Sequence, residues 1–282
     1  MTLRELVSQS EARLRAGAHS DRSRLDAETL LLYVLGQNRA WLLSHWDDEV
    51  GPVTQARYED AIHSRMQGEP IQYITGHAEF FGLPFHVTPA VLIPRPETEH
   101  LVEEILRLAA QWPSPSIADI GTGSGAIAVA LAHTLPTAKI IATDLSSAAL
   151  NIAQQNARSN HVQDRIDFHQ GDLLAPLAGQ QFEIIASNPP YIPQTDHDSL
   201  SVEVREHEPH SALFAGPDGL EIYRRLIPQA RQFLAPNGWL VLEIGYNQQP
   251  AIEALLQATN YRDIHFIPDY QGIPRVASAQ RP

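Results

Sequence analysis

The sequence predicts an α/β fold with a doubly wound, mainly parallel sheet, preceded by a small helical domain and a β-hairpin linker. The main observation is a regular alternation of strand-like and helix-like runs between residues 116 and 280. The second is a glycine-rich turn directly after the first of these strands. The third is that the first part of the chain carries helical patterns only. With 282 residues, the chain can hold one medium and one small domain.

Helical patterns fill residues 1–72, which we predict to be an N-terminal, partner-binding domain. Thr2 and Glu5 have the spacing of a capping box, which starts the first helix. A second helix is expected to end at Gly36, and a later one to begin with Thr54 as its cap. The apolar positions on one face of the second helix are Leu25, Leu32 and Leu35. Nothing in this region suggests catalysis, and partner binding stays open as its role.

Aromatic and β-branched residues replace the helical pattern between residues 71 and 93, with a Gly-Leu-Pro sequence in the middle. This pattern predicts a β-hairpin, and we assign residues 73–93 to a linker between two domains. Residues 94–112 then have the pattern of an amphipathic helix. That helix opens the second domain, residues 94–282.

The alternation that follows supplies the strands and helices of the sheet. The expected strands are residues 116–121, 139–145, 165–174, 182–188, 238–245, 263–268 and 275–280. The expected helices are residues 125–135, 146–160, 219–234 and 249–259. Elements of this length and order are typical of a mainly parallel, doubly wound sheet.

Composition excludes several classes of protein. The net charge is −13 and Lys139 is the only lysine, so the chain repels a phosphate backbone and no direct nucleic-acid binding is expected. A phosphate-binding loop of the Gly-Lys-Ser/Thr type is absent from the sequence. The lack of cysteine excludes disulfides and thiolate metal sites. No apolar run reaches the ~18 residues of a membrane span, and no secretory signal is evident, so we expect a cytoplasmic protein.

The 13 histidines raise the question of a metal site. The densest cluster, Glu206 to His210, is interrupted by Pro209, which prevents a helix from placing two histidines on one face. A third ligand is not evident either. We therefore expect no metal, and instead a solvated loop that covers the substrate.

The glycine-rich turn is the first candidate binding site. Gly121, Gly123 and Gly125 let the backbone turn sharply and approach a ligand before the next helix begins. Together with Ala126 they also match the dinucleotide-binding pattern, so a nicotinamide cofactor stays an alternative, as does a plain tight turn. Asp144 ends the second strand about 20 residues later, where a carboxylate can accept hydrogen bonds from ribose hydroxyls.

Two further strand ends complete a site for a nucleoside-bearing cofactor. Asp172 ends the third strand, where this architecture places adenine. The fourth strand ends in Asn188, Pro189, Pro190 and Tyr191, which offer two acceptors (the amide oxygen of the first and the carbonyl of the second) and a flat ring. Such acceptors suit a planar NH2 group, and they favour the positive charge that develops on nitrogen during attack on a methyl sulfonium. Nicotinamide chemistry would need a hydride path and usually an acid or base, which this segment lacks.

With these motifs, the chain resembles the class I AdoMet-dependent methyltransferases that modify planar nitrogens. Within them it is similar to the release factor glutamine methyltransferase family, also known as PrmC or HemK. The most specific similarities are residues 70–99, 119–128, 187–192 and 208–220. The resemblance covers essentially the whole chain and implies a seven-stranded class I methyltransferase sheet. It also implies transfer of a methyl group from S-adenosyl-L-methionine (AdoMet) to N5 of the glutamine in the Gly-Gly-Gln loop of class 1 peptide chain release factors, which act in translation termination.

The resemblance also implies roles for residues of this chain. The implied AdoMet-binding residues are Gly121, Thr122, Gly123, Ser124 and Gly125 at the methionine part, Asp144 at the ribose, Asp172 and Leu173 at the adenine, and Asn188. The implied substrate-binding residues are Asn188, Pro189, Pro190 and Tyr191, of which the first two are catalytic. Many relatives carry an aromatic residue where this chain has Leu173, so an aliphatic side chain is expected against the adenine. A monomer that grips the release factor with its N-terminal domain is expected.

Other functions of the same site stay open. One is the same chemistry on a ribosomal-protein glutamine or on N6 of adenine, although the acidic chain argues against nucleic acid. Another is a non-enzymatic AdoMet-binding adaptor on an inactive fold, against which the intact glycine turn and Asn188 argue. A third is a dinucleotide oxidoreductase, against which the segment from Asn188 to Tyr191 argues.

Overall fold

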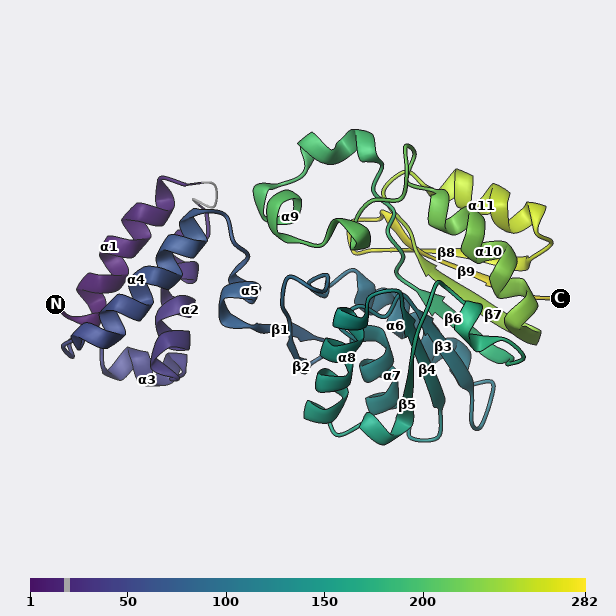
Figure 1. The fold of residues 1–282 in the computed structure, drawn as a ribbon, viewed down its shortest axis with the longest axis horizontal. Coiled ribbons are helices and arrows are strands. Elements are labelled where there is room, and N and C mark those ends of the chain that lie inside the picture. Colours follow the sequence, from purple (N-terminus) through teal and green to yellow (C-terminus); the bar gives the residue numbers. More distant parts are fainter. Residues whose placement is uncertain (18–20) are drawn as a thin grey trace. The chain divides into compact units, whose positions relative to one another are not determined.

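A computed structural model describes residues 1–17 and 21–282, which form two compact units (Figure 1). Unit 1 comprises Met1–Gly76 and Ser201–His207, and unit 2 comprises His77–Leu200 and Glu208–Pro282. A short segment of the later sequence thus belongs to the same unit as the N-terminal helices. Within the described residues, no helix has both the length and the apolar character that a membrane span requires.

Unit 1 is built from helices. They are α1 (Leu3–Arg15), α2 (Ser23–Leu35), α3 (Arg39–Ser44), α4 (Pro52–Met66), α5 (Ile71–Thr75) and α9 (Val202–His207). Apolar side chains of α1, α2 and α4 form its core, among them the fully buried Leu6, Leu30, Leu31, Tyr58 and Ile62. Burying a large aliphatic side chain contributes roughly 1.5–3 kcal/mol, so this core is the main source of stability of the unit.

The helix ends agree in part with the sequence-based predictions. The capping box is confirmed, because the Thr2 side chain accepts from the Glu5 N–H at 3.2 Å and the Glu5 carboxylate accepts from the Thr2 N–H at 2.9 Å. Gly36 ends α2 in the left-handed conformation, as predicted. The prediction for Thr54 was wrong. Helix α4 begins at Pro52, whose fixed φ suits the first helical position.

The buried face of α2 is not the expected one. Leu25 is 46% exposed, whereas Leu30, Leu31 and Val34 are buried in the core that α2 forms with α1 and α4. The other two leucines of the expected face, Leu32 and Leu35, are partly buried at its margin. Because α2 is apolar on more than one side, its sequence pattern alone could not show which face the neighbouring helices cover.

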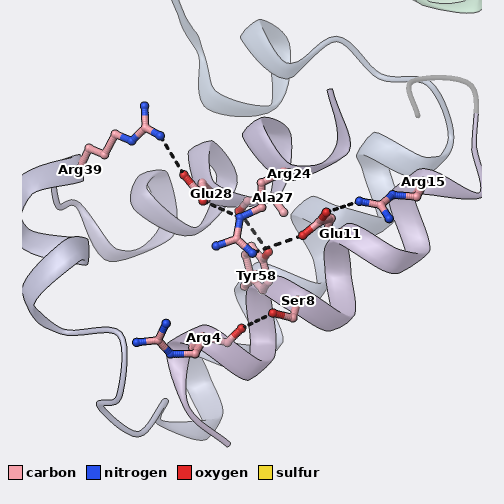
Figure 2. Close-up of polar contacts among 9 residues, drawn as sticks. All are labelled: Arg4, Ser8, Glu11, Arg15, Arg24, Ala27, Glu28, Arg39 and Tyr58. Carbon is pink, nitrogen blue, oxygen red and sulfur yellow. Dashed lines mark hydrogen bonds and ion pairs between the residues drawn. The ribbon is translucent and has the colours of Figure 1, made fainter. Parts of the chain in front are cut away.

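Charged side chains form a network over α1 and α2, as Figure 2 shows. Glu11 pairs with Arg15 and accepts from Arg24 at 3.3 Å. Glu28 accepts from Arg24 Nε at 2.6 Å and lies 3.6 Å from a guanidinium nitrogen of Arg39. Such solvent-accessible pairs contribute about 0–1 kcal/mol each, so the apolar core holds the helices together.

One ionic group of unit 1 is buried. Arg65 Nε donates to Asp26 Oδ2 at 2.7 Å, and these side chains are only 3% and 2% exposed. The same guanidinium donates to the Glu203 carboxylate of α9. Gly68 follows α4 and lies against Val202, the first residue of α9. A Cβ added at Gly68 would lie 2.7 Å from the Val202 side chain, so α9 packs directly on the chain after α4. Helix α9 is thus fixed to the N-terminal helices by a buried ionic group and a close backbone contact.

Unit 2 contains a two-stranded hairpin and a seven-stranded sheet. The hairpin strands are β1 (His77–Phe80) and β2 (Leu83–His86). The sheet strands are β3 (Ser116–Ile120), β4 (Lys139–Asp144), β5 (Ile166–Gln170), β6 (Phe182–Ser187), β7 (Leu234–Glu243), β8 (Arg262–Pro268) and β9 (Pro274–Gln280). Their order is β5-β4-β3-β6-β7-β9-β8, with parallel pairs from β5 to β7 and β9 antiparallel to both neighbours. The predicted mainly parallel sheet is confirmed.

Helices cover both faces of this sheet (Figure 1). They are α6 (Thr98–Ala109), α7 (Ala126–Thr134), α8 (Ser147–Ser159), α10 (Glu221–Phe233) and α11 (Gln249–Ala258), with short 3-10 helices at Gln163–Arg165, Ala175–Leu177, Gln194–Ser199 and His210–Ala212. On β3, Ile117 belongs to a core with α6, α7 and α8, and Ala118 belongs to a second core with α10 and α11. This alternation confirms the doubly wound arrangement.

Several boundaries differ from the predicted ones: α6 begins at Thr98 instead of residue 94, and β7 begins at Leu234 instead of residue 238. The hairpin is shorter than residues 71–93, because Ile71–Thr75 forms α5, which Gly76 ends in the left-handed conformation. Strand β5 ends at Gln170, so Asp172 lies just beyond the strand. The chain turns at Gly171, whose backbone packs on the ring of Pro176. A Cβ added at Gly171 would lie only 2.9 Å from the ring carbons of Pro176.

Candidate active site

A cavity of about 310 Å³ lies at the carboxyl ends of β3, β4 and β6 in unit 2. Strand β3 has β4 on one side and β6 on the other, which makes this edge the point where doubly wound sheets bind ligands. The predicted site residues that line the cavity are Gly121, Thr122, Gly123, Ser124, Asp144, Asp172, Leu173, Asn188, Pro189 and Pro190. The lining does not include Gly125 or Tyr191.

Backbone hydrogen bonds hold the glycine-rich turn between β3 and α7. The N–H groups of Gly121 and Thr122 both donate to the Thr143 carbonyl, at 2.8 and 2.9 Å. Gly125 has a φ of +81°, and a Cβ there would lie 3.0 Å from that of Ala153 in α8. Gly125 therefore lets the turn pack closely on α8, whereas the residues before it form the cavity wall.

Asp144 ends β4, as predicted, and its carboxylate holds the turn. Oδ2 accepts from the Gly123 N–H and Oδ1 from the Ser146 N–H, both at 2.8 Å. Each carboxylate oxygen can accept more than one hydrogen bond, so Asp144 can still bind donors in the cavity. The next residue, Leu145, also lines the cavity and is 68% exposed. The sequence analysis missed Leu145. The pattern that could have indicated it is a large apolar residue directly after an aspartate that ends a strand.

Asp119 of β3 is another residue that the sequence analysis missed. It is fully buried, its Oδ2 accepts from the Thr122 hydroxyl at 2.6 Å, and its Oδ1 has no partner among the described residues. Burial raises the pKa of Asp119 to about 7, with the bond from Thr122 opposing the shift and the charge of Asp144 adding to it. The pattern that could have indicated Asp119 is an acidic residue inside an apolar strand, just before the glycine-rich turn.

Asp172 and Leu173 line the cavity together with Ile222 and Arg225 of α10. Arg225 donates to the Asp172 carboxylate, which ties the chain after β5 to α10. The Thr143 hydroxyl donates to the Leu173 carbonyl at 3.1 Å and so holds this residue at its φ of +51°. Both predicted residues are thus fixed at the cavity wall.

Asn188 directly follows β6, and its side-chain nitrogen donates to Thr98 Oγ1 at 3.1 Å. The Thr98 hydroxyl in turn donates to Oε2 of Glu243, the last residue of β7, at 2.6 Å. Thr98 is 90 residues from Asn188 and 145 from Glu243, so no local sequence pattern could connect them.

Glu243 is a buried carboxylate with a second donor, the Tyr191 hydroxyl at 3.3 Å from Oε1. Burial raises the pKa of Glu243 to about 7, although the bonds from Thr98 and Tyr191 favour its ionised form. Burial and the charge of Glu243 raise the pKa of Tyr191 well above its ordinary range. The ring of Tyr191 packs against the core under α10 and α11. Tyr191 therefore contacts the core and Glu243, and its predicted contact with substrate stays a prediction.

Two neighbours of Thr98 bind other parts of unit 2. Arg95, which lines the cavity, donates to both carboxylate oxygens of Glu208 at 2.5 and 2.7 Å. Glu99 accepts from the Phe81 N–H in the hairpin turn at 2.8 Å. Arg95 and the first two residues of α6 thus connect the hairpin, Asn188 and the chain after α9. Among the described residues, no group of three or more histidine and acidic side chains could hold a metal ion.

Two family models match the chain. The PrmC N-terminal domain matches residues 5–76, and the methyltransferase small domain matches residues 98–205. Among solved structures, the ribosomal protein L11 methylase of Lactobacillus delbrueckii subsp. bulgaricus is 26% identical with a TM-score of 0.50, over 67% of this chain and 81% of that chain. Unit 2 therefore has a methyltransferase fold.

Curated relatives cover the entire chain. A release factor glutamine methyltransferase of Koribacter versatilis is 44% identical over 284 residues, which are 100% of this chain and 99% of the relative. One of Moorella thermoacetica, with the same name, is 47% identical over 282 residues, again 100% of this chain and 99% of the relative. The chain belongs to the release factor glutamine methyltransferase family.

Proposed function

We propose that this chain methylates N5 of the glutamine in the Gly-Gly-Gln loop of class 1 peptide chain release factors, with AdoMet as methyl donor. Family membership supports the substrate. The observation that carries the proposal is the Asn188 amide at the cavity wall, whose nitrogen is engaged by Thr98. Its oxygen is then available to the substrate, which needs an acceptor for an amide N–H.

The chemistry of the cavity wall supports AdoMet as the cofactor. The turn of residues 121–125 would hold the methionine part, and the Asp144 carboxylate would accept from the ribose hydroxyls. Asp172 and the aliphatic side chains of Leu145 and Leu173 would hold the adenine, which needs both an acceptor for its amine and an apolar surface. When bound, AdoMet supplies an electrophilic methyl group on a sulfonium.

The glutamine side chain would bind beside the methyl group through two acceptors. The Asn188 oxygen and the Pro189 carbonyl would each accept from one N–H of the substrate amide, while Pro190 fixes the direction of the backbone. These bonds orient the nitrogen, and they stabilise the positive charge that develops on it during transfer. The methylated nitrogen then loses its proton, so no strong base is required. Asn188 would also border the methionine part of AdoMet.

We propose residues 1–72 as the part that grips the release factor, residues 73–93 as a linker and residues 94–282 as the catalytic domain. The net charge of −13 argues against direct binding of nucleic acid. A monomer that acts in the cytoplasm, where termination takes place, completes the proposal.

A comparison of substrates tests the proposed function. The chain and AdoMet would be mixed separately with a class 1 release factor, a ribosomal protein and an adenine-containing oligonucleotide, and methyl incorporation would be measured by mass spectrometry. Methylation of the release factor alone is expected. Methylation of another substrate would move the activity to it, and AdoMet binding without any transfer would favour an adaptor. A lack of AdoMet binding would refute the proposal.

A further inference from the structure

A chain of hydrogen bonds leads from the cavity wall to a buried carboxylate. Asn188 Nδ2 donates to Thr98 Oγ1 at 3.1 Å, and Thr98 Oγ1 donates to Glu243 Oε2 at 2.6 Å. From the other side, the Tyr191 hydroxyl donates to Glu243 Oε1 at 3.3 Å. Asn188 and Tyr191 are the two ends of the Asn-Pro-Pro-Tyr segment, so a single carboxylate is linked to both ends.

The number of available hydrogens fixes the direction of each bond. The Thr98 hydroxyl has one hydrogen, which the ionised Glu243 carboxylate takes. Toward Asn188 the Thr98 oxygen can therefore only accept, so Asn188 must turn its NH2 group toward it. The amide oxygen of Asn188 then lies on the opposite edge of the side chain. That orientation offers an acceptor, instead of a donor, to a substrate NH2 group.

Solvent cannot replace these partners, because Thr98 is only 4% exposed and Glu243 only 1%. A buried polar group that loses its partner is not compensated by water. The main chain at Glu243 is also fixed, since the Tyr223 hydroxyl donates to its carbonyl at 2.7 Å. The carboxylate is thus held at the end of β7 by contacts within the chain.

We propose that Thr98 and Glu243 are positioning residues for methyl transfer, which hold the Asn188 amide with its oxygen toward the substrate nitrogen, and that Tyr191 supports the carboxylate. The inference rests on the proposed function and adds to it Thr98, which also lines the cavity, and the buried Glu243 beyond it. It also gives a role to Thr98, the first residue of α6, beyond its contribution to the fold.

The ionisation of Glu243 should control this orientation. A protonated carboxyl has its own hydrogen to donate, so Thr98 or Tyr191 would lose its acceptor. Burial is the main cause that brings the pKa of Glu243 to about 7. Of the nearby charges, Glu97 raises this pKa and Arg275 of β9 lowers it. The rate constant of transfer should therefore increase as the pH rises through about 7.

Matched variants test the inference on release factor methylation. Thr98→Val keeps the shape but removes the hydroxyl, and it should lower kcat about tenfold to a hundredfold with the Kd for AdoMet within about twofold. Thr98→Ser should restore kcat to within a few fold of the wild type. The control is Thr134→Val, which removes a hydroxyl on the surface of α7 that bonds only within its own helix.

The carboxylate is tested in the same way. Glu243→Gln should lower kcat by a similar factor and remove the pH dependence near 7. Glu104→Gln is its control, because Glu104 is another buried carboxylate of unit 2 but pairs with Arg107 on α6. Unchanged kcat and pH profile in Thr98→Val and Glu243→Gln would overturn the inference.

A second readout separates this inference from the proposed function. If the wild type methylates no release factor, the proposed function fails. The orientation of Asn188 is then decided by NMR exchange of its side-chain NH2 hydrogens with solvent. Protection in the wild type that is lost in Thr98→Val supports the inference, and equal exchange in the two proteins overturns it.

Discussion

Replacement of Asp26 by Asn should destabilise unit 1 by about 3 kcal/mol. Arg65 and Asp26 are 3% and 2% exposed, so the guanidinium would lose a buried counter-charge without gaining water. Removing one partner of a buried pair costs roughly 3–5 kcal/mol. The lower end applies here, because Arg65 keeps the Glu203 carboxylate and the Glu69 carbonyl as acceptors.

Urea unfolding followed by tryptophan fluorescence measures this loss. Trp41 and Trp46 belong to unit 1, and Trp112 and Trp239 belong to unit 2. Replacing the latter two with Phe makes the signal report on unit 1 alone. The free energy of unfolding of this background, with and without Asp26→Asn, gives the cost directly.

Asp47→Asn is the matched control. Asp47 pairs with Arg4, but these side chains are 85% and 56% exposed, and such a pair contributes about 0–1 kcal/mol. If Asp26→Asn cost no more than this control, the Asp26–Arg65 pair would be no stronger than a surface pair. The inference that this buried pair stabilises unit 1 would then be refuted.

Three further predictions concern unit 2. Asp119 and Glu243 have pKa values of about 7 in the folded chain against ordinary values of 3.8 and 4.5, so they bind protons that the unfolded chain has released. The free energy of unfolding should therefore fall as the pH rises from about 4.5 to 7 and level off above, and urea midpoints that rise over this range would contradict the assignment. Asp144→Asn should weaken AdoMet binding about tenfold in calorimetry through the loss of a charged acceptor, and an unchanged Kd would remove Asp144 from the ribose site. Gly125→Ala should destabilise the chain by about 1–3 kcal/mol, because a Cβ would be strained at its positive φ and crowd Ala153, and an unchanged Tm would disprove that packing.

The parts of the site that the sequence predicted are those that local patterns encode. The glycine turn follows a strand and begins a helix, so Gly121 and Gly123 could be placed at the cavity from their neighbours alone. Asp144 and Asn188 stand at or directly after the ends of apolar runs, which fixes them at the carboxyl edge of a parallel sheet. Local order along the chain was enough for these residues.

The remaining features depend on contacts between distant segments. Thr98 and Glu243 meet across 145 residues of sequence, and nothing near either residue indicates the partner. Helix α9 follows the Asn-Pro-Pro-Tyr segment yet belongs to unit 1, where the Glu203 carboxylate accepts a partly buried bond from Arg65. The face of α2 was misjudged for the same reason, since its neighbours decide which apolar side is buried.

The central claim is tested most directly by locating the methyl group on the release factor. The factor would be treated with the chain and AdoMet, digested, and sequenced by mass spectrometry, in parallel with Asn188→Ala enzyme and with a factor whose loop glutamine is Ala. The account predicts one methyl group on the Gly-Gly-Gln glutamine, absent from the altered factor and formed at least about a hundredfold more slowly by Asn188→Ala. A methyl group on another residue, or an unchanged rate with Asn188→Ala, would contradict it.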